Sequence, residues 1–210
     1  EVYPAASISL SSQILPEIKE YERSSTTVMN ATVMPVVERY LNRLSQAAAG
    51  MGVASRLHVM QSNGGIMTAE TAGRKSVNTI LSGLAGGVLG GVTLARQAGF
   101  ENAITIDMGG TSFDISLAYQ GRIRFSREAE IGGHAIAVPM IDVHTLGAGG
   151  GSIAWIDAGG ALQVGPRSAG AVPGPACYDR GGALPTVTDA NVVLGRLNPG
   201  YLLGGSMAVR

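Results

Sequence analysis

The chain has 210 residues, of which 45% are hydrophobic and 14% are charged, and its net charge is zero. This length allows one or two domains with a substantial core. The zero net charge excludes the basic footprint of a nucleic-acid or anionic-membrane binder, so we expect neither partner. Cys177 is the single cysteine, which excludes a disulfide within the chain and favours a reducing, cytoplasmic compartment.

Helices are expected to alternate with strands in the first hundred residues. Apolar side chains recur every three or four positions across residues 24–51 and predict a long helix. A strand is predicted over 56–61, and a short helix over 68–74 that begins with Thr68 as its cap. A helix follows over 83–98, and its many glycines indicate that another backbone or a ligand approaches it closely.

Strands dominate after residue 100. Residues 104–118 read ITIDMGGTSFDISLA, two apolar runs joined by a glycine pair, and predict a β-hairpin. The whole pattern predicts a mixed α/β fold, with an N-terminal segment at 1–55 and one continuous domain at 56–210. Further elements are expected as short strands at 122–126, 128–131 and 137–143, a second hairpin at 153–164, and a helix at 188–197 that begins at Thr188.

The tip of the hairpin at 104–118 has the composition of a phosphate-binding loop. Gly109 and Gly110 carry no Cβ, so their backbone N–H groups can approach a ligand closely. The alternative is an ordinary hairpin turn, in which the neighbouring polar side chains only satisfy turn hydrogen bonds. The polar side chains that would suit a phosphate and its metal ion are Asp107, Thr111, Ser112 and Asp114.

A second candidate site follows a predicted strand. Asp142 and His144 form a D-x-H pair whose side chains would share one face of a strand, where they could ligate a divalent metal or act as an acid–base pair. The alternative is a structural hydrogen bond that anchors the glycine run at 147–151. That run could bind a nucleotide through its amides, or could be a tight crossing between strands. Residues 63–65, an asparagine followed by two glycines, pose a similar choice between a ligand contact and a simple turn.

The remaining polar residues are weaker candidates for a site. We expect His58 to be buried in an apolar strand and His134 to be exposed. Cys177 has no neighbouring base in the sequence, and we expect it to be a buried thiol. Asp189 and Asn191 are expected to serve the cap of their helix.

Six segments, in order along nearly the whole chain, resemble the hydantoinase/oxoprolinase A family, which includes N-methylhydantoinase, 5-oxoprolinase and acetone carboxylase subunits. The helix at 83–98 followed by the hairpin also resembles the actin-like ATPase superfamily. The chain departs from the family at two positions: it has Leu84 where the family usually has proline, and Phe113 where the family often has threonine. Neither change affects an expected phosphate contact. The six segments are SNGGIMTAE (62–70), LSGLAGGVLGG (81–91), DMGGTSFD (107–114), DVHTLGAGGGSIAW (142–155), PGPACYDRGG (173–182) and TVTDANVVLGRL (186–197).

The resemblance implies an actin-like, ribonuclease H-like ATPase fold, with a mixed sheet and flanking helices, of which this chain holds the second phosphate loop. A missing N-terminal domain would carry the first phosphate loop, so we expect the chain to be part of a larger subunit. ATP and Mg²⁺ would bind between the two domains. Asp107 would orient the metal or its bound water, and Asp142 and His144 would be candidates for a second divalent metal. The nucleotide-binding residues that the resemblance implies are Gly109, Gly110, Thr111, Ser112 and Asp114 in the hairpin, Gly83, Gly86 and Gly87 in the helix, and Gly149, Gly150 and Gly151 in the glycine run.

The activity that the resemblance implies is ATP-dependent hydrolysis of a cyclic amide, such as a hydantoin or 5-oxoproline. Phosphorylation of the carbonyl oxygen would make the amide open to attack by water. The implied partner is a hydantoinase B-type subunit, and the implied substrate is a small molecule. One alternative is the ATPase subunit of an acetone or acetophenone carboxylase, and another is an ATP-driven switch of the chaperone or activator kind.

Overall fold

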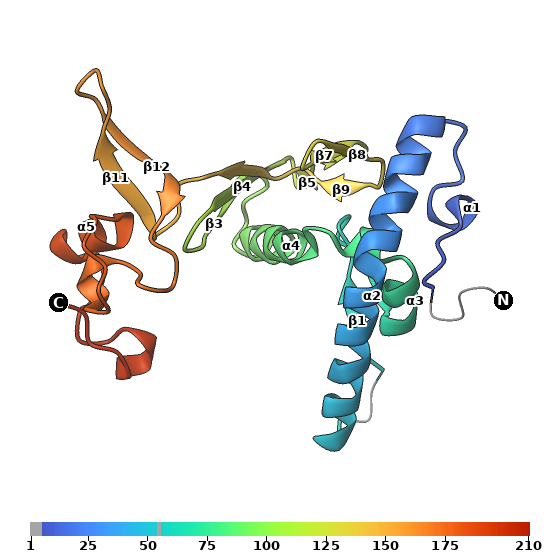
Figure 1. Cartoon of the computed structure of the whole chain (residues 1–210), viewed down its shortest axis with the longest axis horizontal. Coiled ribbons are helices and arrows are strands. Elements are labelled where there is room, and N and C mark those ends of the chain that lie inside the picture. The colour runs from blue at the N-terminus through green and yellow to red at the C-terminus, as the bar shows by residue number, and fades with distance from the viewer. Residues whose placement is uncertain (1–5, 54–55) are drawn as a thin grey trace. The chain divides into compact units, whose positions relative to one another are not determined.

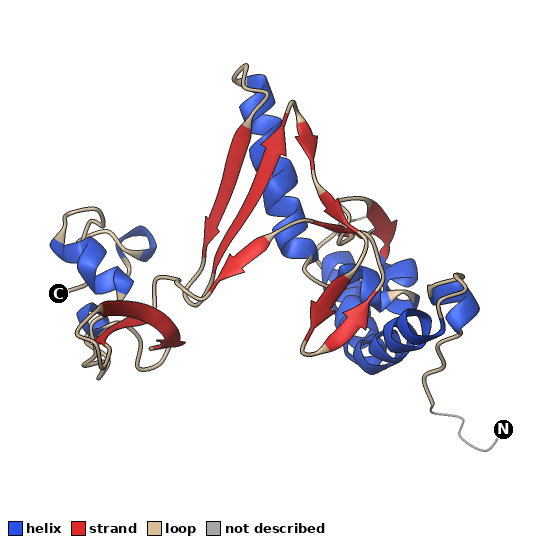
Figure 2. Ribbon diagram, turned by 90° about the horizontal axis from the view of Figure 1, so that it is seen from above, coloured by secondary structure: helices blue, strands red, loops and turns tan. Residues whose placement is uncertain are grey.

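The computed structural model describes residues 6–53 and 56–210, which form a mixture of helices and antiparallel strand pairs (Figures 1 and 2). The chain divides into two compact units. The first unit contains the described residues up to Thr105 together with Ser116–Val143, and the second contains Ile106–Ile115 and His144–Arg210. The mixed α/β class is therefore confirmed, whereas the domain boundary expected at residue 55 stays a prediction.

The first unit is built on the long helix α2, Glu20–Gly50. It begins four residues earlier than the apolar pattern predicts, and Pro35 lies inside it. Helix α3 (Ala69–Arg74) has the expected N-cap: the Thr68 hydroxyl accepts a hydrogen bond from the Thr71 amide over 3.2 Å, so this prediction is confirmed. The shorter helical elements of this part are α1 (Ser11–Ile14), α3 (Ala69–Arg74) and the 3₁₀ turn η1 (Ser76–Thr79).

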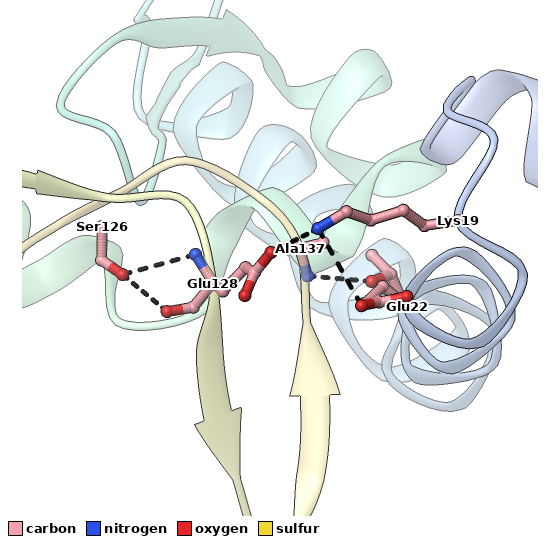
Figure 3. Close-up of polar contacts among 6 residues, drawn as sticks. Lys19, Glu22, Ser126, Glu128 and Ala137 are labelled. Carbon is pink, nitrogen blue, oxygen red and sulfur yellow. Dashed lines mark hydrogen bonds and ion pairs between the residues drawn. The ribbon is translucent and has the colours of Figure 1, made fainter.

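Buried polar side chains fix α2 to its neighbours. The Asn30 amide nitrogen donates to the Arg74 carbonyl over 3.0 Å, and its oxygen accepts from the Val77 amide over 3.0 Å. The buried Thr26 hydroxyl accepts from the Ala137 amide over 3.0 Å. On the surface Lys19 donates to Glu128 over 2.6 Å (Figure 3).

Helix α4 (Ser82–Gln97) packs on a small apolar core of the same unit. The core includes Val88 and Val92 from α4, Ala118 from a strand and Ile141. A Cβ at Gly91 would lie 2.7 Å from the Thr105 methyl group, so this helix glycine is required by a close approach of the neighbouring strand. Of the helices that the structure describes, none is both long enough and apolar enough to span a membrane.

The strands of the first unit are shorter than the sequence predicts. The strand expected over 137–143 is confined to β9, Met140–Ile141. Proline at 139 has no N–H to donate, and the Ala137 amide is already bonded to Thr26. The other short strands of this unit are β1 (His58–Met60), β2 (Ile66–Thr68), β5 (Arg122–Ile123), β6 (Phe125–Ser126), β7 (Ala129–Ile131) and β8 (His134–Ile136).

Strands β3 (Ala103–Met108) and β4 (Phe113–Tyr119) are hydrogen-bonded neighbours and form the expected hairpin. In the second unit, β10 (His144–Leu146) pairs antiparallel with the start of β4. The second expected hairpin is confirmed as β11 (Ser152–Ile156) and β12 (Leu162–Ser168). The unit is completed by α5 (Val187–Val193) and the 3₁₀ turns η2 (Ala176–Tyr178) and η3 (Leu203–Gly205).

The start of α5 differs from the sequence prediction. Thr186, and not Thr188, is the N-cap, and it forms a capping box with Asp189. The Thr186 hydroxyl accepts from the Asp189 amide, and the Asp189 carboxylate accepts from the Thr186 amide over 2.7 Å. Thr188 therefore lies in the first turn of the helix, where its side chain is free to bond elsewhere.

Candidate functional site

The tip of the β3–β4 hairpin is a four-residue turn, 109–112, that belongs to the second unit. The Gly109 amide donates to the Ser112 carbonyl over 2.9 Å and closes the turn. Gly110 and Thr111 are exposed, as is Asp107 on the strand before the turn. A Cβ at Gly110 would meet no atom within 4 Å, so the space beside the tip is open.

The glycine run at 147–151 holds the tip by three backbone hydrogen bonds. Gly149 donates to the Thr111 carbonyl over 3.2 Å, Gly150 to the Gly109 carbonyl over 2.9 Å, and Gly151 to the Gly110 carbonyl over 2.6 Å. The amides of this run are thereby occupied within the protein. In this structure the run supports the tip, and its contact with a nucleotide stays a prediction.

The contact between the glycine run and the tip requires glycine at two positions of the run. A Cβ at Gly149 would lie 2.6 Å from the backbone nitrogen and carbonyl carbon of Thr111. A Cβ at Gly151 would lie 2.9 Å from the Gly110 carbonyl oxygen. Real Cβ atoms do not approach backbone this closely, so the glycine run is explained by the close crossing of two chain segments.

The three hydrogen bonds also decide which way the amides of the tip point. In a planar trans peptide the C=O of one residue and the N–H of the next point in opposite directions, and the tip contains no cis peptide bond. Because the carbonyls of residues 109–111 face the glycine run, the amides of Gly110, Thr111 and Ser112 face away from it. These amides donate no hydrogen bond to any residue that the structure describes. Successive free amides in a turn are the donors that anion-binding nests use, and we call the amides of Gly110, Thr111 and Ser112 the amide nest.

Asp114 braces the tip from within. Its side chain is buried, and its carboxylate accepts from the Thr145 hydroxyl over 2.5 Å and from the Ser112 hydroxyl over 3.1 Å. Each carboxylate oxygen thus has a protein donor, one on β10 and one in the turn. The structure gives Asp114 a supporting position, and its expected contact with a ligand stays a prediction.

The candidate metal ligands lie on three different segments of the chain. Asp107 lies on β3, Asp142 lies in the irregular segment after β9, and His144 is the first residue of β10. The strand expected to carry both Asp142 and His144 on one face is interrupted at residues 142–143. In the described part of the chain, no group of three or more His, Cys, Asp or Glu side chains is arranged to hold a metal ion. Their catalytic and metal-binding roles stay predictions.

The helix glycines Gly83, Gly86 and Gly87 lie in the first half of α4, in the first unit. A Cβ at Gly83 would meet no atom within 4 Å, and one at Gly86 would lie 3.9 Å from the Met60 side chain. Packing within the protein therefore does not require glycine at these two positions. Their predicted contact with nucleotide is not tested by the packing.

Thr188 is a functional candidate that sequence reasoning missed. Its side chain is nearly buried, and both its amide and its hydroxyl donate to the Gly150 carbonyl, over 2.8 and 2.9 Å. The signal in the sequence was the pair of threonines in TVTD, of which only one can be the N-cap. The other is left to bond outside the helix.

The weaker candidates take structural positions. His58 is exposed, so its expected burial is wrong, because β1 belongs to a two-stranded sheet that leaves this residue uncovered; His134 is exposed as expected. Asn63 accepts from the Gly65 amide over 2.9 Å and so forms a simple turn. The carbonyl of Asn191 accepts the amides of Arg196 and Leu197 at the far end of α5.

Cys177 is buried as expected, and its environment favours the protonated thiol over the thiolate. Burial raises the pKa of its thiol to about 11, and the nearby Asp189 carboxylate adds to the effect. For Asp189 burial acts to raise the pKa, but hydrogen bonds from Cys177 and Thr186 outweigh it and hold the pKa below the usual 3.8. Asp189 is therefore an ionised cap, as predicted, that also accepts from the Cys177 amide over 2.7 Å.

Comparison with known proteins gives consistent matches over this chain. The family model described as hydantoinase/oxoprolinase matches residues 23–210. The caprolactamase subunit alpha of Pseudomonas jessenii is 51% identical over 195 residues, which are 93% of this chain and 28% of that protein.

Two solved structures contain the same fold. The crystal structure of ATP-dependent caprolactamase from Pseudomonas jessenii superimposes with a TM-score of 0.82 at 48% identity, over all of this chain and 30% of that one. The nucleotide-free structure of acetone carboxylase gives a TM-score of 0.79 at 31% identity, over 95% of this chain and 28% of that one. The chain thus spans less than a third of the length of these relatives.

Proposed function

Because the chain belongs to the hydantoinase/oxoprolinase family, we propose that it forms one wall of the ATP site in an ATP-dependent hydrolase of cyclic amides. The observation that carries the proposal is the free amide nest at Gly110, Thr111 and Ser112. An anionic phosphate is the ligand that such a nest fits best. The proposed fold is the half of an actin-like ATPase that holds the second phosphate loop, in a larger subunit.

The residues around the tip fit a nucleotide phosphate and its metal ion. The nest supplies three donors, and Gly110 leaves open space for a ligand to approach. The exposed Asp107 carboxylate adds an oxygen of the type that Mg²⁺ prefers. We propose that Asp107 holds Mg²⁺ or its bound water, while the amides hold the phosphates. Bound Mg²⁺ would neutralise charge on the transferred phosphoryl group.

In the proposed reaction the cyclic amide oxygen attacks the terminal phosphorus of ATP, and ADP leaves. Water then adds to the activated carbon, and the ring C–N bond breaks to leave an acyl phosphate on the opened chain. A second water hydrolyses the acyl phosphate to a carboxylate, and phosphate leaves. The net change is one ATP and two waters consumed for each ring opened. The nest contributes by holding phosphate in position, which is the main way a protein accelerates phosphoryl transfer.

The relatives support a cyclic amide as the substrate class. The caprolactamase subunit is 51% identical to this chain, and caprolactam is a cyclic amide. A second candidate is the ATPase subunit of a ketone carboxylase, which the match to acetone carboxylase at a TM-score of 0.79 favours. Both reactions would begin with phosphorylation of a carbonyl oxygen. Since the name of the caprolactamase relative is that of a subunit, we also propose a B-type partner subunit for the present protein.

The substrate classes are separated by measuring ADP release from the whole subunit with its partner. Release that requires a lactam, a hydantoin or 5-oxoproline supports the first candidate. Release that requires a ketone and bicarbonate supports the second. ADP release that responds only to a protein partner, with no effect of small molecules, would contradict both and leave an ATP-driven switch.

The phosphate-loop assignment itself is tested by Asp107→Asn in the whole subunit. The substitution removes a charge that the proposal places on the metal, and the side chain is exposed, so the fold should persist while ATP turnover is lost. Asp157→Asn is the matched control, because Asp157 lies in the turn between β11 and β12 and not at the tip. Its Oδ1 accepts from the Gly159 amide over 2.9 Å, and the asparagine Oδ1 can accept the same hydrogen bond. Normal ATP turnover in a folded Asp107→Asn subunit would contradict the assignment.

A further inference from the structure

Thr188 and the phosphate-binding tip are connected by two successive peptide groups. The amide and the hydroxyl of Thr188 both donate to the Gly150 carbonyl, over 2.8 and 2.9 Å. The peptide group that carries this carbonyl also carries the Gly151 amide, which donates to the Gly110 carbonyl over 2.6 Å. The next peptide group joins the Gly110 carbonyl to the free amide of Thr111.

We propose that Thr188 is a positioning residue for phosphate binding, which acts through these two peptide groups on the Thr111 amide. The inference rests on the proposed function and adds a residue that lies outside the phosphate loop. Thr188 does not touch the ligand. It fixes the orientation of the peptide group that in turn fixes the donor.

The geometry supports both an orienting and a polarising effect. Two donors on one carbonyl hold the plane of the 150–151 peptide group, because rotation of that plane would break both hydrogen bonds. The antiparallel directions of C=O and N–H carry the constraint across each group. Hydrogen bonds arranged in such a chain also polarise one another, by roughly 10–30% per bond. The Thr111 amide should therefore be a better donor to phosphate when Thr188 is in place.

Hydrogen bonds at the start of α5 hold the backbone of Thr188 in position. The capping box joins Thr186 to Asp189 on either side of it. Asp189 also accepts from the amides of Cys177 and Ala176, over 2.7 and 3.3 Å. The first turn of α5 is thus tied to η2 independently of the tip, so Thr188 can act as an anchor.

The test compares Thr188→Val with Thr188→Ser in the whole subunit. Valine keeps the shape and the backbone amide but lacks the hydroxyl donor, and its helix propensity is similar to that of threonine. Loss of one net hydrogen bond should raise the KM for ATP, and the Kd for ADP measured by calorimetry, about five- to tenfold, with kcat changed less. Serine keeps the hydroxyl and should restore both constants to within about twofold of the wild type. Should the valine variant fail to fold, Thr188→Ala carries the same prediction, because it removes the hydroxyl without placing a second methyl group beside Gly150.

A purely structural role is separated by Thr186→Val, which breaks the cap of the same helix without touching Gly150. The proposal expects a smaller rise in the Kd for ADP in this control than in Thr188→Val at equal loss of thermal stability. An equal rise in both variants, or an unchanged Kd in Thr188→Val, would overturn the proposal. If Asp107→Asn abolishes turnover while Thr188→Val has normal constants, only the role of Thr188 fails. If Asp107→Asn turns over ATP normally, the proposed function itself fails.

Discussion

Substitution of Gly149 by alanine should separate the glycine run from the tip of the β3–β4 hairpin. The added Cβ would lie 2.6 Å from the nitrogen and carbonyl carbon of Thr111 and 2.7 Å from the Gly110 carbonyl carbon. All three are backbone atoms, so no side-chain rotation relieves the collision. One of the two segments must move, and the hydrogen bonds from residues 149–151 to the tip lengthen or break.

The expected magnitude follows from those three hydrogen bonds. Each contributes a net stabilisation of about 1 kcal/mol, so their loss should lower the free energy of unfolding by about 3 kcal/mol. This is a large part of the roughly 5–15 kcal/mol that stabilises an ordinary domain. Disordering the nest should also weaken ATP binding in the whole subunit, by as much as about a hundredfold if the same energy is lost on binding.

The assay is unfolding of the chain in urea, followed by the fluorescence of its single tryptophan. Trp155 lies in the second unit, where its indole N–H donates to the Gly165 carbonyl over 2.8 Å. Gly90→Ala is the control, because a Cβ at this position in α4 would meet no atom within 4 Å. This control should be stabilised by about 0.5–1 kcal/mol. A Gly149→Ala chain that unfolds at the wild-type urea concentration would refute the close crossing.

Three further predictions concern groups that support the site and the fold. Asn30→Ala should lower the free energy of unfolding by about 2–4 kcal/mol, because it leaves the Arg74 carbonyl and the Val77 amide without their partner; a loss below about 1 kcal/mol in urea unfolding would contradict the buried contacts. The Cys177 thiol, whose pKa is about 11, should react slowly with a disulfide reagent at pH 8 in the folded chain and quickly in urea, and fast reaction of the folded chain would show that it is not buried. Asp189→Asn should destabilise the chain at pH 7, and because folding lowers the pKa of Asp189 below 3.8, the stabilisation by this carboxylate is complete above that pH and is lost as the pH falls below it. The difference in unfolding free energy between the variant and the wild type should therefore shrink below about pH 4, and a difference that is constant from pH 7 to pH 3 would contradict an ionised cap.

The sequence predicts the helices and hairpins because their patterns are local. The apolar period of residues 24–51 and the glycine pair at 109–110 each act within one element, and the structure has the helix and the hairpin that they indicate. The composition of the tip likewise predicts a phosphate loop without any knowledge of the fold. Its free amides could not be predicted, because their direction depends on which segment bonds the carbonyls.

The role of the glycine run illustrates what composition leaves open. Glycines at 149–151 indicate that something approaches closely, but they fit a nucleotide and a second backbone equally well. The structure shows that the approaching backbone is the tip itself. In the same way TVTD contains two threonines that can cap, and only the position of Gly150 explains why Thr186 caps while Thr188 bonds outward.

Two expectations failed because a local sequence pattern does not include the contacts that a segment makes with distant parts of the chain. The apolar run at 137–143 suggests a continuous strand, yet Ala137 bonds a side chain of α2 and Pro139 has no amide, so the strand shortens and separates Asp142 from β10. His58 lies among apolar residues, yet its two-stranded sheet leaves it exposed. Burial is a property of the assembled sheet, and a strand sequence alone does not contain it.

The most direct test of the phosphate-binding nest is a titration of the whole subunit, labelled with ¹⁵N at glycine, serine and threonine, with ADP and Mg²⁺ while the amide resonances are recorded. The amides of Gly110, Thr111 and Ser112 should shift together in a saturable way, because they would change from free groups to donors to phosphate. The amides of residues 149–151, which already donate to the tip, should shift less. Saturable binding of ADP that leaves the three tip amides unchanged would contradict the central claim.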